Sequence, residues 1–172
     1  TNHPYPNEYA CEGIPILGAY TLLQDWDGIY FYTFEHDDPS KWKTKNPGYF
    51  DILHDPTKLA NLAAASLMFH RGDVGPAENT VLRNYNQTEL AEGIRSGSKG
   101  RPFFTAGFPP ITPLITRTRI NSFNGGENEF PSSENADPII SETQELLWYH
   151  GNETGLVIID TDKTQAFIGF SE

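Results

Sequence analysis

The hydrophobic positions near the start of the chain follow first a helical and then an extended pattern. Between Glu8 and Asp25 they recur every three or four residues, which predicts a helix with Asn7 as its N-cap. Pro15 lies inside this stretch and predicts a kink or a break there. Ile29–Phe34 is a continuous run of β-branched and aromatic residues, typical of a strand buried on both faces. A buried strand directly after a helix predicts a parallel αβ unit.

A second helical pattern follows a polar loop. Asp55-Pro-Thr57 predicts the start of the helix, with Asp55 as its cap, and Gly72 predicts its end. Leucine and alanine residues gather on one side of this helix, so we expect that face to lie on a sheet.

Beyond residue 75 the pattern changes to short hydrophobic runs between segments rich in Gly, Pro, Asn and Ser. Asn86 and Glu89 have the spacing of a capping box and predict a short helix over 86–96. We therefore place a boundary near residues 72–76. The predicted strands are Thr80–Arg83, Leu114–Ile120, Glu145–Tyr149, Leu156–Asp160 and Ala166–Phe170.

Length and charge narrow the choice of function. The chain has 172 residues and a formal net charge of -11, with 12 Lys and Arg against 23 Asp and Glu. Binding to a phosphate backbone needs clustered basic residues, so nucleic acid is not an expected partner. The apolar runs are too short to cross a bilayer, so a membrane is not expected either. Cys11, the only cysteine, is expected to be a small packed residue rather than a nucleophile.

Aromatic residues make up 13% of the chain. Flat rings can stack on sugars, and they can equally fill a β-rich core, which composition alone favours.

Several segments resemble the end of the (β/α)8 barrel in retaining glycoside hydrolases of clan A. They are Asn2-His-Pro-Tyr-Pro-Asn-Glu-Tyr9, Gln24-Asp-Trp-Asp-Gly-Ile-Tyr-Phe-Tyr-Thr-Phe34, Tyr49-Phe-Asp-Ile52 and Phe69-His-Arg-Gly-Asp73. The ending, Gly155-Leu-Val-Ile-Ile-Asp-Thr-Asp-Lys-Thr-Gln-Ala-Phe-Ile-Gly-Phe170, is similar to the small C-terminal β domain of some bacterial members. The resemblance implies the last αβα portion of a barrel over 1–74 and a small antiparallel β-sandwich-like domain over 75–172. It also implies an extracellular or periplasmic location.

The resemblance also implies which carboxylates the reaction needs. Members of this clan use one glutamate as acid/base after the fourth strand and another as nucleophile at the end of the seventh. With residues 8–25 as the seventh helix, both positions fall before Thr1, so we expect this chain alone to be inactive. Glu35, after the expected eighth strand, is the remaining catalytic candidate, at a place that supplies substrate contacts in the family.

Ligand contacts in such a barrel come from the C-terminal ends of the strands. Tyr30 and Phe31 are expected in the core, and Trp26, before the strand, is expected to pack structurally. Trp42 fits an outer sugar platform and a structural role equally well. The carbohydrate-binding candidates are Asn2, His3, Tyr32, Glu35, His36, Trp42 and, in the β domain, Trp148.

A metal site is a further alternative, because His3, His36, Asp37 and Asp38 are all possible ligands. They lack a fixed ligand spacing, so we expect a solvated loop, no metal and no cofactor.

We therefore expect a carbohydrate-active polypeptide, the C-terminal portion of a retaining glycoside hydrolase that acts on a polysaccharide or oligosaccharide. One alternative is a non-catalytic carbohydrate-binding module. The other is an interaction domain that completes its barrel with another chain or with a second copy.

Overall fold

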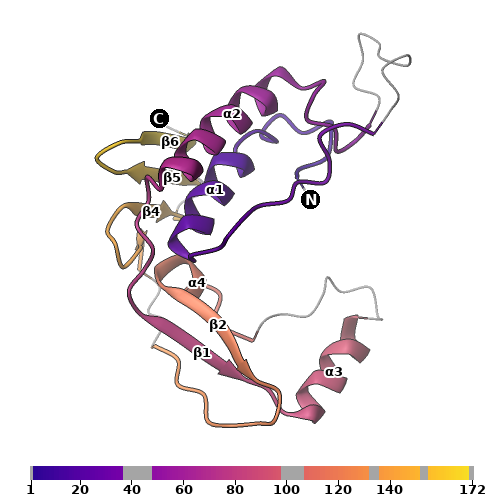
Figure 1. Cartoon of the computed structure of the whole chain (residues 1–172), viewed down its shortest axis with the longest axis vertical. Helices are drawn as coiled ribbons and strands as arrows, with labels where there is room; N and C mark the ends of the chain where they lie inside the picture. Colours follow the sequence, from indigo (N-terminus) through magenta and orange to yellow (C-terminus); the bar gives the residue numbers. More distant parts are fainter. Residues whose placement is uncertain (1, 37–47, 98–106, 132–135, 152–154, 171–172) are drawn as a thin grey trace.

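The computed structural model describes residues 2–36, 48–97, 107–131, 136–151 and 155–170. Helices α1 and α2 lie side by side, the four-stranded sheet lies against them, and the β1–β2 ribbon extends away from the pair (Figure 1). In chain order the elements are α1 (Gly13–Leu23), α2 (Pro56–Arg71), β1 (Thr80–Asn84), α3 (Gln87–Gly97), α4 (Thr112–Ile115), β2 (Arg117–Ser122), β3 (Ile139–Ile140), β4 (Leu146–Tyr149), β5 (Leu156–Asp160) and β6 (Gln165–Gly169).

Helix α1 begins later than the sequence pattern predicts. Residues 8–12 form turns, in which Asn7 Oδ1 accepts a hydrogen bond from the Tyr9 backbone N–H (2.9 Å). Pro15 therefore lies in the first turn of the helix, where backbone N–H groups have no partner within the helix. The helix continues from Gly13 to Leu23 without interruption, so the expected break at Pro15 is wrong.

Two capping predictions are confirmed. Asp55 Oδ1 accepts from two backbone N–H groups in the first turn of α2 (both 3.1 Å), and α2 ends before Gly72, whose φ is 60°. At α3, Asn86 Oδ1 accepts from the Glu89 N–H (2.9 Å), and the Glu89 carboxylate accepts from the Asn86 N–H (2.8 Å). These side chains satisfy backbone groups that the start of a helix leaves unpaired.

The second half of the chain contains one antiparallel sheet and one parallel pair. The strand order β3-β4-β5-β6 is antiparallel throughout. Strands β1 and β2, by contrast, pair in parallel, with Thr80 opposite Arg117. A parallel pair needs a long crossover, which α3 and α4 lie on here. The expectation of a wholly antiparallel second half is therefore wrong, and Thr112–Ile115 is helical rather than part of a strand. The barrel portion and the sandwich stay predictions.

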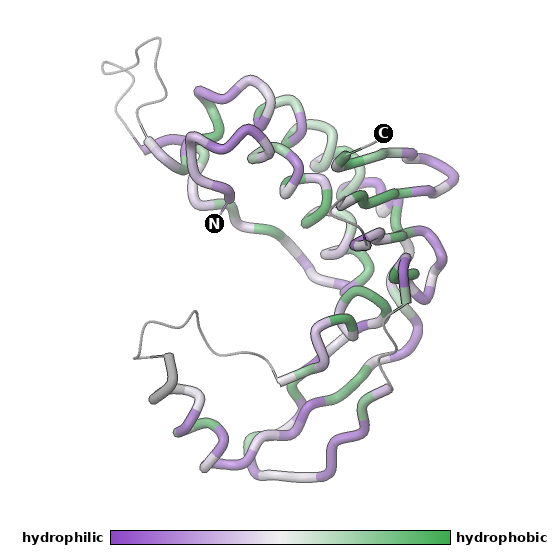
Figure 2. Tube along the Cα trace, turned by 180° about the vertical axis from the view of Figure 1, so that it is seen from behind, coloured by the Kyte–Doolittle hydropathy of each residue, from purple (hydrophilic) through white to green (hydrophobic). Residues whose placement is uncertain are grey.

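Helices α1 and α2 and the four-stranded sheet share one hydrophobic core. A Cβ atom on Gly18 of α1 would lie 3.1 Å from the terminal methyl of Met68 and 3.5 Å from the Ala65 methyl, so α1 and α2 pack closely at this glycine. Figure 2 colours most of β5 and β6 as hydrophobic. The buried core residues are Ala19, Tyr20 and Leu23 of α1, Met68 of α2, Val74, Ala77, and Leu146, Val157, Ile159 and Ile168 of the sheet.

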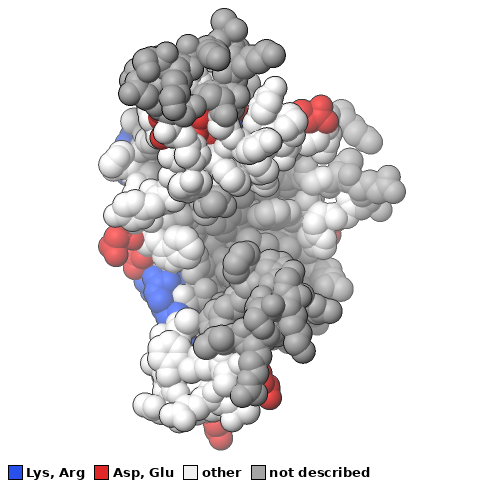
Figure 3. Space-filling model, turned by 90° about the vertical axis from the view of Figure 1, so that its right-hand side faces the viewer, with Lys and Arg blue, Asp and Glu red and all other residues white. Residues whose placement is uncertain are grey.

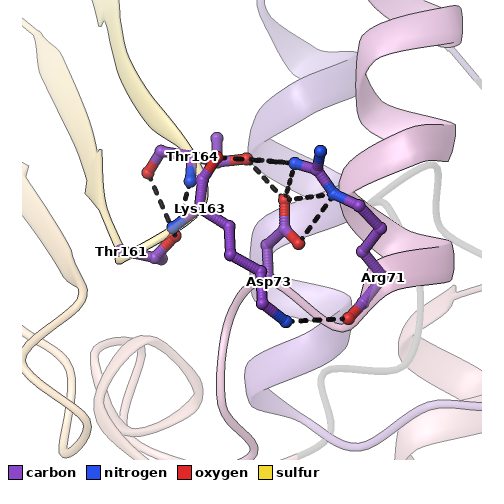
Figure 4. A network of polar contacts seen from close by, with 5 residues as sticks. All are labelled: Arg71, Asp73, Thr161, Lys163 and Thr164. Atoms are coloured by element: carbon purple, nitrogen blue, oxygen red, sulfur yellow. Dashed lines mark hydrogen bonds and ion pairs between the residues drawn. The ribbon is translucent and has the colours of Figure 1, made fainter.

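Hydrogen bonds at the ends of α1 and α2 connect these two helices to the second half of the chain. Gln24, at the end of α1, is buried and donates to the backbone oxygens of Pro113 (2.9 Å) and Thr116 (2.6 Å). At the end of α2, Arg71 and Asp73 bind the turn between β5 and β6, where the Lys163 ammonium donates to the Arg71 backbone oxygen (3.3 Å) (Figure 4). The helices and the sheet are thus linked by hydrogen bonds as well as by packing.

Residues 29–34 belong to no strand of the described structure, and the backbone bends at Tyr32 and at Phe34. Their exposure alternates, with the side chains at 30, 32 and 34 exposed and those between half-buried. Tyr30 is 95% exposed and Trp26 is 51% exposed, so the core role expected for Tyr30 and the packing role expected for Trp26 are both wrong. A strand needs another strand beside it, whereas Thr33 and Phe34 form backbone hydrogen bonds with residues 50–53, which are themselves turn and bend, so the predicted strand is wrong.

Candidate functional site

Three segments distant in sequence meet at the carboxyl end of residues 29–34. Asn2 is buried there, and its side-chain amide donates to the backbone oxygens of Tyr32 (3.1 Å) and Phe50 (2.7 Å). The Thr33 N–H donates to the same Phe50 oxygen (3.3 Å), and the Ile52 N–H donates to Thr33 O (3.2 Å). The N-terminal segment, residues 32–36 and residues 48–54 thereby form one unit.

We name the polar side chains gathered here the Tyr32 cluster. Four of the predicted carbohydrate-binding residues belong to this region. One of them, Asn2, is buried and hydrogen-bonds to the backbone, so it is not exposed to a ligand. The members of the Tyr32 cluster are Asn2, Tyr32, Glu35, His36, Asp51, His54 and Lys58.

Lys58 is a fully buried cation beneath the N-terminal segment. Its ammonium donates to Asn2 Oδ1 (3.0 Å) and to the His3 backbone oxygen (2.7 Å). Burial lowers the pKa of Lys58, and the nearby carboxylates of Asp55 and Asp51 only partly oppose this effect. Lys58 therefore positions residues 2 and 3, and it is a residue that sequence reasoning missed.

His36 connects a buried carboxylate to an exposed phenol. Its Nδ1 lies 2.5 Å from Asp51 Oδ1, and its Nε2 lies 2.8 Å from the Tyr32 hydroxyl oxygen. Asp51 is fully buried, and a Cβ atom on Gly48 would overlap Asp51 Oδ2, so the Asp51 carboxylate lies close against the backbone of this glycine. Sequence reasoning singled out His36 and Tyr32 but missed Asp51, which joins them.

Glu35, the catalytic candidate, faces His54. Their Oε2 and Nε2 atoms are 2.8 Å apart, and the side chains are 16% and 13% exposed. The carboxylate is thus largely withdrawn from solvent and paired with a histidine that no sequence pattern points to.

Exposed aromatic rings surround this unit. The Tyr32 ring, 53% exposed as a residue, meets Phe50 at 5.9 Å between centroids. Beside it, a shallow hollow is lined by residues 4–9 and Tyr49, and it contains the exposed rings of Tyr5, Tyr9 and Tyr49. The Tyr5 N–H donates to the Tyr49 backbone oxygen (2.6 Å), which holds the two sides of the hollow together.

The side chains of the remaining candidates lie outside the Tyr32 cluster or outside the described residues. His3 is exposed, and its ring lies against Gly13 at the start of α1. Trp148 of β4 is half-buried, with its ring 5.8 Å from that of Tyr20 in the core. Trp42 lies outside the described residues, as do Asp37 and Asp38.

The described residues contain no group of three or more His, Cys, Asp or Glu that could hold a metal ion. None of the described helices combines the length and apolar composition needed to cross a membrane. On the face drawn in Figure 3, the largest visible group of Lys and Arg side chains lies in one small area, and further basic atoms are seen near the upper left edge.

No protein-family model, curated protein or solved structure matches this chain. The resemblance to clan A glycoside hydrolases therefore stays a prediction.

Proposed function

We propose that this chain is the carbohydrate-binding C-terminal portion of a retaining glycoside hydrolase. The observation that carries the proposal is the exposed Tyr32 ring, with its hydroxyl hydrogen-bonded to His36, beside a hollow rich in tyrosine. Rings of this kind pack on the apolar face of a sugar, while polar groups at fixed positions bind its hydroxyls. The acidic net charge of -11 suits a neutral ligand better than an anionic one.

The proposal assigns binding, and not hydrolysis, to the chain by itself. A retaining mechanism needs two carboxyl groups on either side of the bond that is cleaved. The carboxylate of Glu35 is paired with His54, and Asp51 is fully buried beneath His36. We expect the purified chain to leave aryl glycosides intact. Hydrolysis that disappears in Glu35→Gln would contradict this assignment.

Affinity electrophoresis tests the binding. The chain should be retarded in gels that contain a soluble β-glucan, a xylan or a mannan, and Tyr32→Ala should abolish the retardation. Phe167→Ala is the matched control, because Phe167 is an exposed ring (73%) on β6 and lines neither the Tyr32 cluster nor the hollow. Unchanged mobility of the wild-type chain on all three polysaccharides would remove the proposal.

A second candidate function is assembly with another polypeptide. Residues 29–34 alternate in exposure and belong to no strand in the described part of the chain, and their backbone hydrogen bonds to residues 50–53 involve Thr33 and Phe34, at one end of the segment. Such a segment can accept strands at its edges. Light scattering that gives a monomeric mass at high concentration would count against assembly between copies of this chain.

A further inference from the structure

Three side chains of the Tyr32 cluster form a chain of hydrogen bonds from the interior to the surface. Asp51 is fully buried at its inner end, and Tyr32 is half-exposed at its outer end. His36 lies between them and is held through both ring nitrogens, at 2.5 Å from Asp51 Oδ1 and 2.8 Å from the Tyr32 hydroxyl. Its ring also meets the Tyr32 ring edge to face, 5.1 Å between centroids. The imidazole is thus fixed in place and in orientation.

The buried Asp51 carboxylate determines which group donates in each of the two hydrogen bonds of His36. An ionised carboxylate only accepts, so His36 Nδ1 donates to Asp51. Within the described part of the chain Asp51 Oδ2 has no hydrogen-bond partner, so His36 supplies the side-chain donor to this buried carboxylate. A neutral imidazole with its proton on Nδ1 has a lone pair on Nε2, and the Tyr32 hydroxyl donates to it.

This direction determines what the Tyr32 oxygen offers to a ligand. Its one proton is used toward His36, so only its acceptor lone pairs face outward. We infer that Tyr32 binds a sugar hydroxyl as a hydrogen-bond acceptor, with His36 and Asp51 as positioning residues, so that the site favours a hydroxyl over a carboxylate. A carboxylate cannot donate, and Tyr32 could donate to it only by giving up the hydrogen bond with His36. The inference rests on the proposed function, because it names the ligand group that the same site selects.

The hydrogen-bond direction can be measured without any ligand. Long-range ¹H–¹⁵N correlation of the histidine rings at pH 7.5, assigned with His36→Gln, reports which nitrogen carries the proton. The Nδ1–H form of His36 should exceed the Nε2–H form by about tenfold or more, because its partner is ionised. Asp51→Leu removes the acceptor and should make the Nε2–H form predominant. Asp51→Asn retains the shape and should bring the two forms closer to equal populations, whereas Asp27→Asn, which removes an equal charge at an exposed site, should change nothing.

The ligand preference is tested with glucose and glucuronate, which differ only in the group at C6. Their dissociation constants are measured by NMR titration of the wild-type chain, Tyr32→Phe and the control Tyr149→Phe. Because Tyr32→Phe changes no charge, it isolates the contribution of the hydroxyl. It should weaken glucose binding by about three- to tenfold and change glucuronate binding by less than about twofold.

The positioning roles of His36 and Asp51 and the ligand preference of Tyr32 are contradicted by different results. A predominant Nε2–H form in the wild-type chain, or a ratio that Asp51→Leu leaves unchanged, would overturn the positioning roles. Equal loss of both sugars in Tyr32→Phe, or a greater loss of glucuronate, would overturn the preference for a donor. If neither sugar binds any variant, the proposed function fails and the ligand preference fails with it, while the tautomer result still decides the positioning roles.

Discussion

The Arg71 guanidinium donates to the carboxylate of Asp73, whose side chain is fully buried against the β5–β6 turn (Figure 4). The Thr164 hydroxyl donates to the same carboxylate (2.6 Å). This contact joins the end of α2 to a hairpin that lies more than half the chain away in sequence. It explains how the helices and the sheet are held in one orientation.

Replacing this carboxylate should destabilise the fold in a pH-dependent way. The hydrogen bond from Arg71 lowers the pKa of Asp73 below its usual 3.8, burial opposes this, and Thr164 adds to the lowering. The stabilisation is therefore present above pH 3.8 and is lost as the pH falls through the lower folded value. Asp73→Asn should lower the free energy of unfolding at pH 7 by about 2 kcal/mol. In urea titrations the difference from wild type should shrink at pH 3, and the exposed neighbour Asp162→Asn should have little effect at either pH.

Two glycines with positive φ should respond very differently to alanine. At Gly72 (φ 60°) an added Cβ meets nothing within 4 Å, so Gly72→Ala should cost only the backbone strain, about 1 kcal/mol. At Gly169 (φ 125°) the Cβ would overlap the Gly155 carbonyl oxygen, which accepts the Phe170 N–H (3.0 Å). Gly169→Ala should therefore shift the urea midpoint several times further. Similar shifts for the two variants would contradict the close pairing of β5 and β6.

Helices and sheet should unfold together, because they share a core. Leu146 of β4 is fully buried, and Leu146→Ala should cost about 3 kcal/mol. The helical circular dichroism signal and the amide protection of β5 should be lost in a single transition in urea. Helical signal that survives after the sheet has unfolded would show two independent cores.

The buried ammonium of Lys58 should make stability rise with pH in the alkaline range. Burial lowers the pKa of Lys58, so the unfolded chain binds this proton more strongly than the folded chain. The free energy of unfolding of the wild type should therefore rise as the pH is raised toward 10.5, whereas that of Lys58→Met should show no such rise. At pH 7, Lys58→Met should also loosen residues 2 and 3, seen as faster amide exchange there, because Asn2 loses its donor. Equal pH slopes for the two proteins would contradict a lowered pKa.

The sequence predicted the features that depend on neighbouring residues. The caps at Asp55 and at Asn86 with Glu89 follow from side chains that bond backbone groups two or three residues away. The start of α1 was misjudged because the apolar spacing continues through residues 8–12, where turn hydrogen bonds compete with the helix.

The features that depend on distant partners could not be predicted. Asp51, His54 and Lys58 gain their roles only when residues 2–5, 32–36 and 48–54 meet. One signal was available, because Lys58 lies four residues before Leu62 and seven before Ala65, on the apolar side of α2. The parallel pairing of β1 with β2 likewise depends on how the intervening chain crosses over.

A residue-level map of sugar binding is the sharpest test of the proposed carbohydrate site. The ¹⁵N-labelled chain is titrated with cellohexaose, xylohexaose and mannohexaose, and amide shifts are followed in the wild type, Tyr32→Ala and Phe167→Ala. We predict that at least one oligosaccharide shifts the signals of residues 32–36 and of the hollow that contains Tyr5 and Tyr49. Tyr32→Ala should abolish these shifts, and Phe167→Ala should retain them. Shifts confined to the β3–β6 sheet, or no shift with any of the three sugars, would contradict the proposed binding of carbohydrate at the Tyr32 cluster.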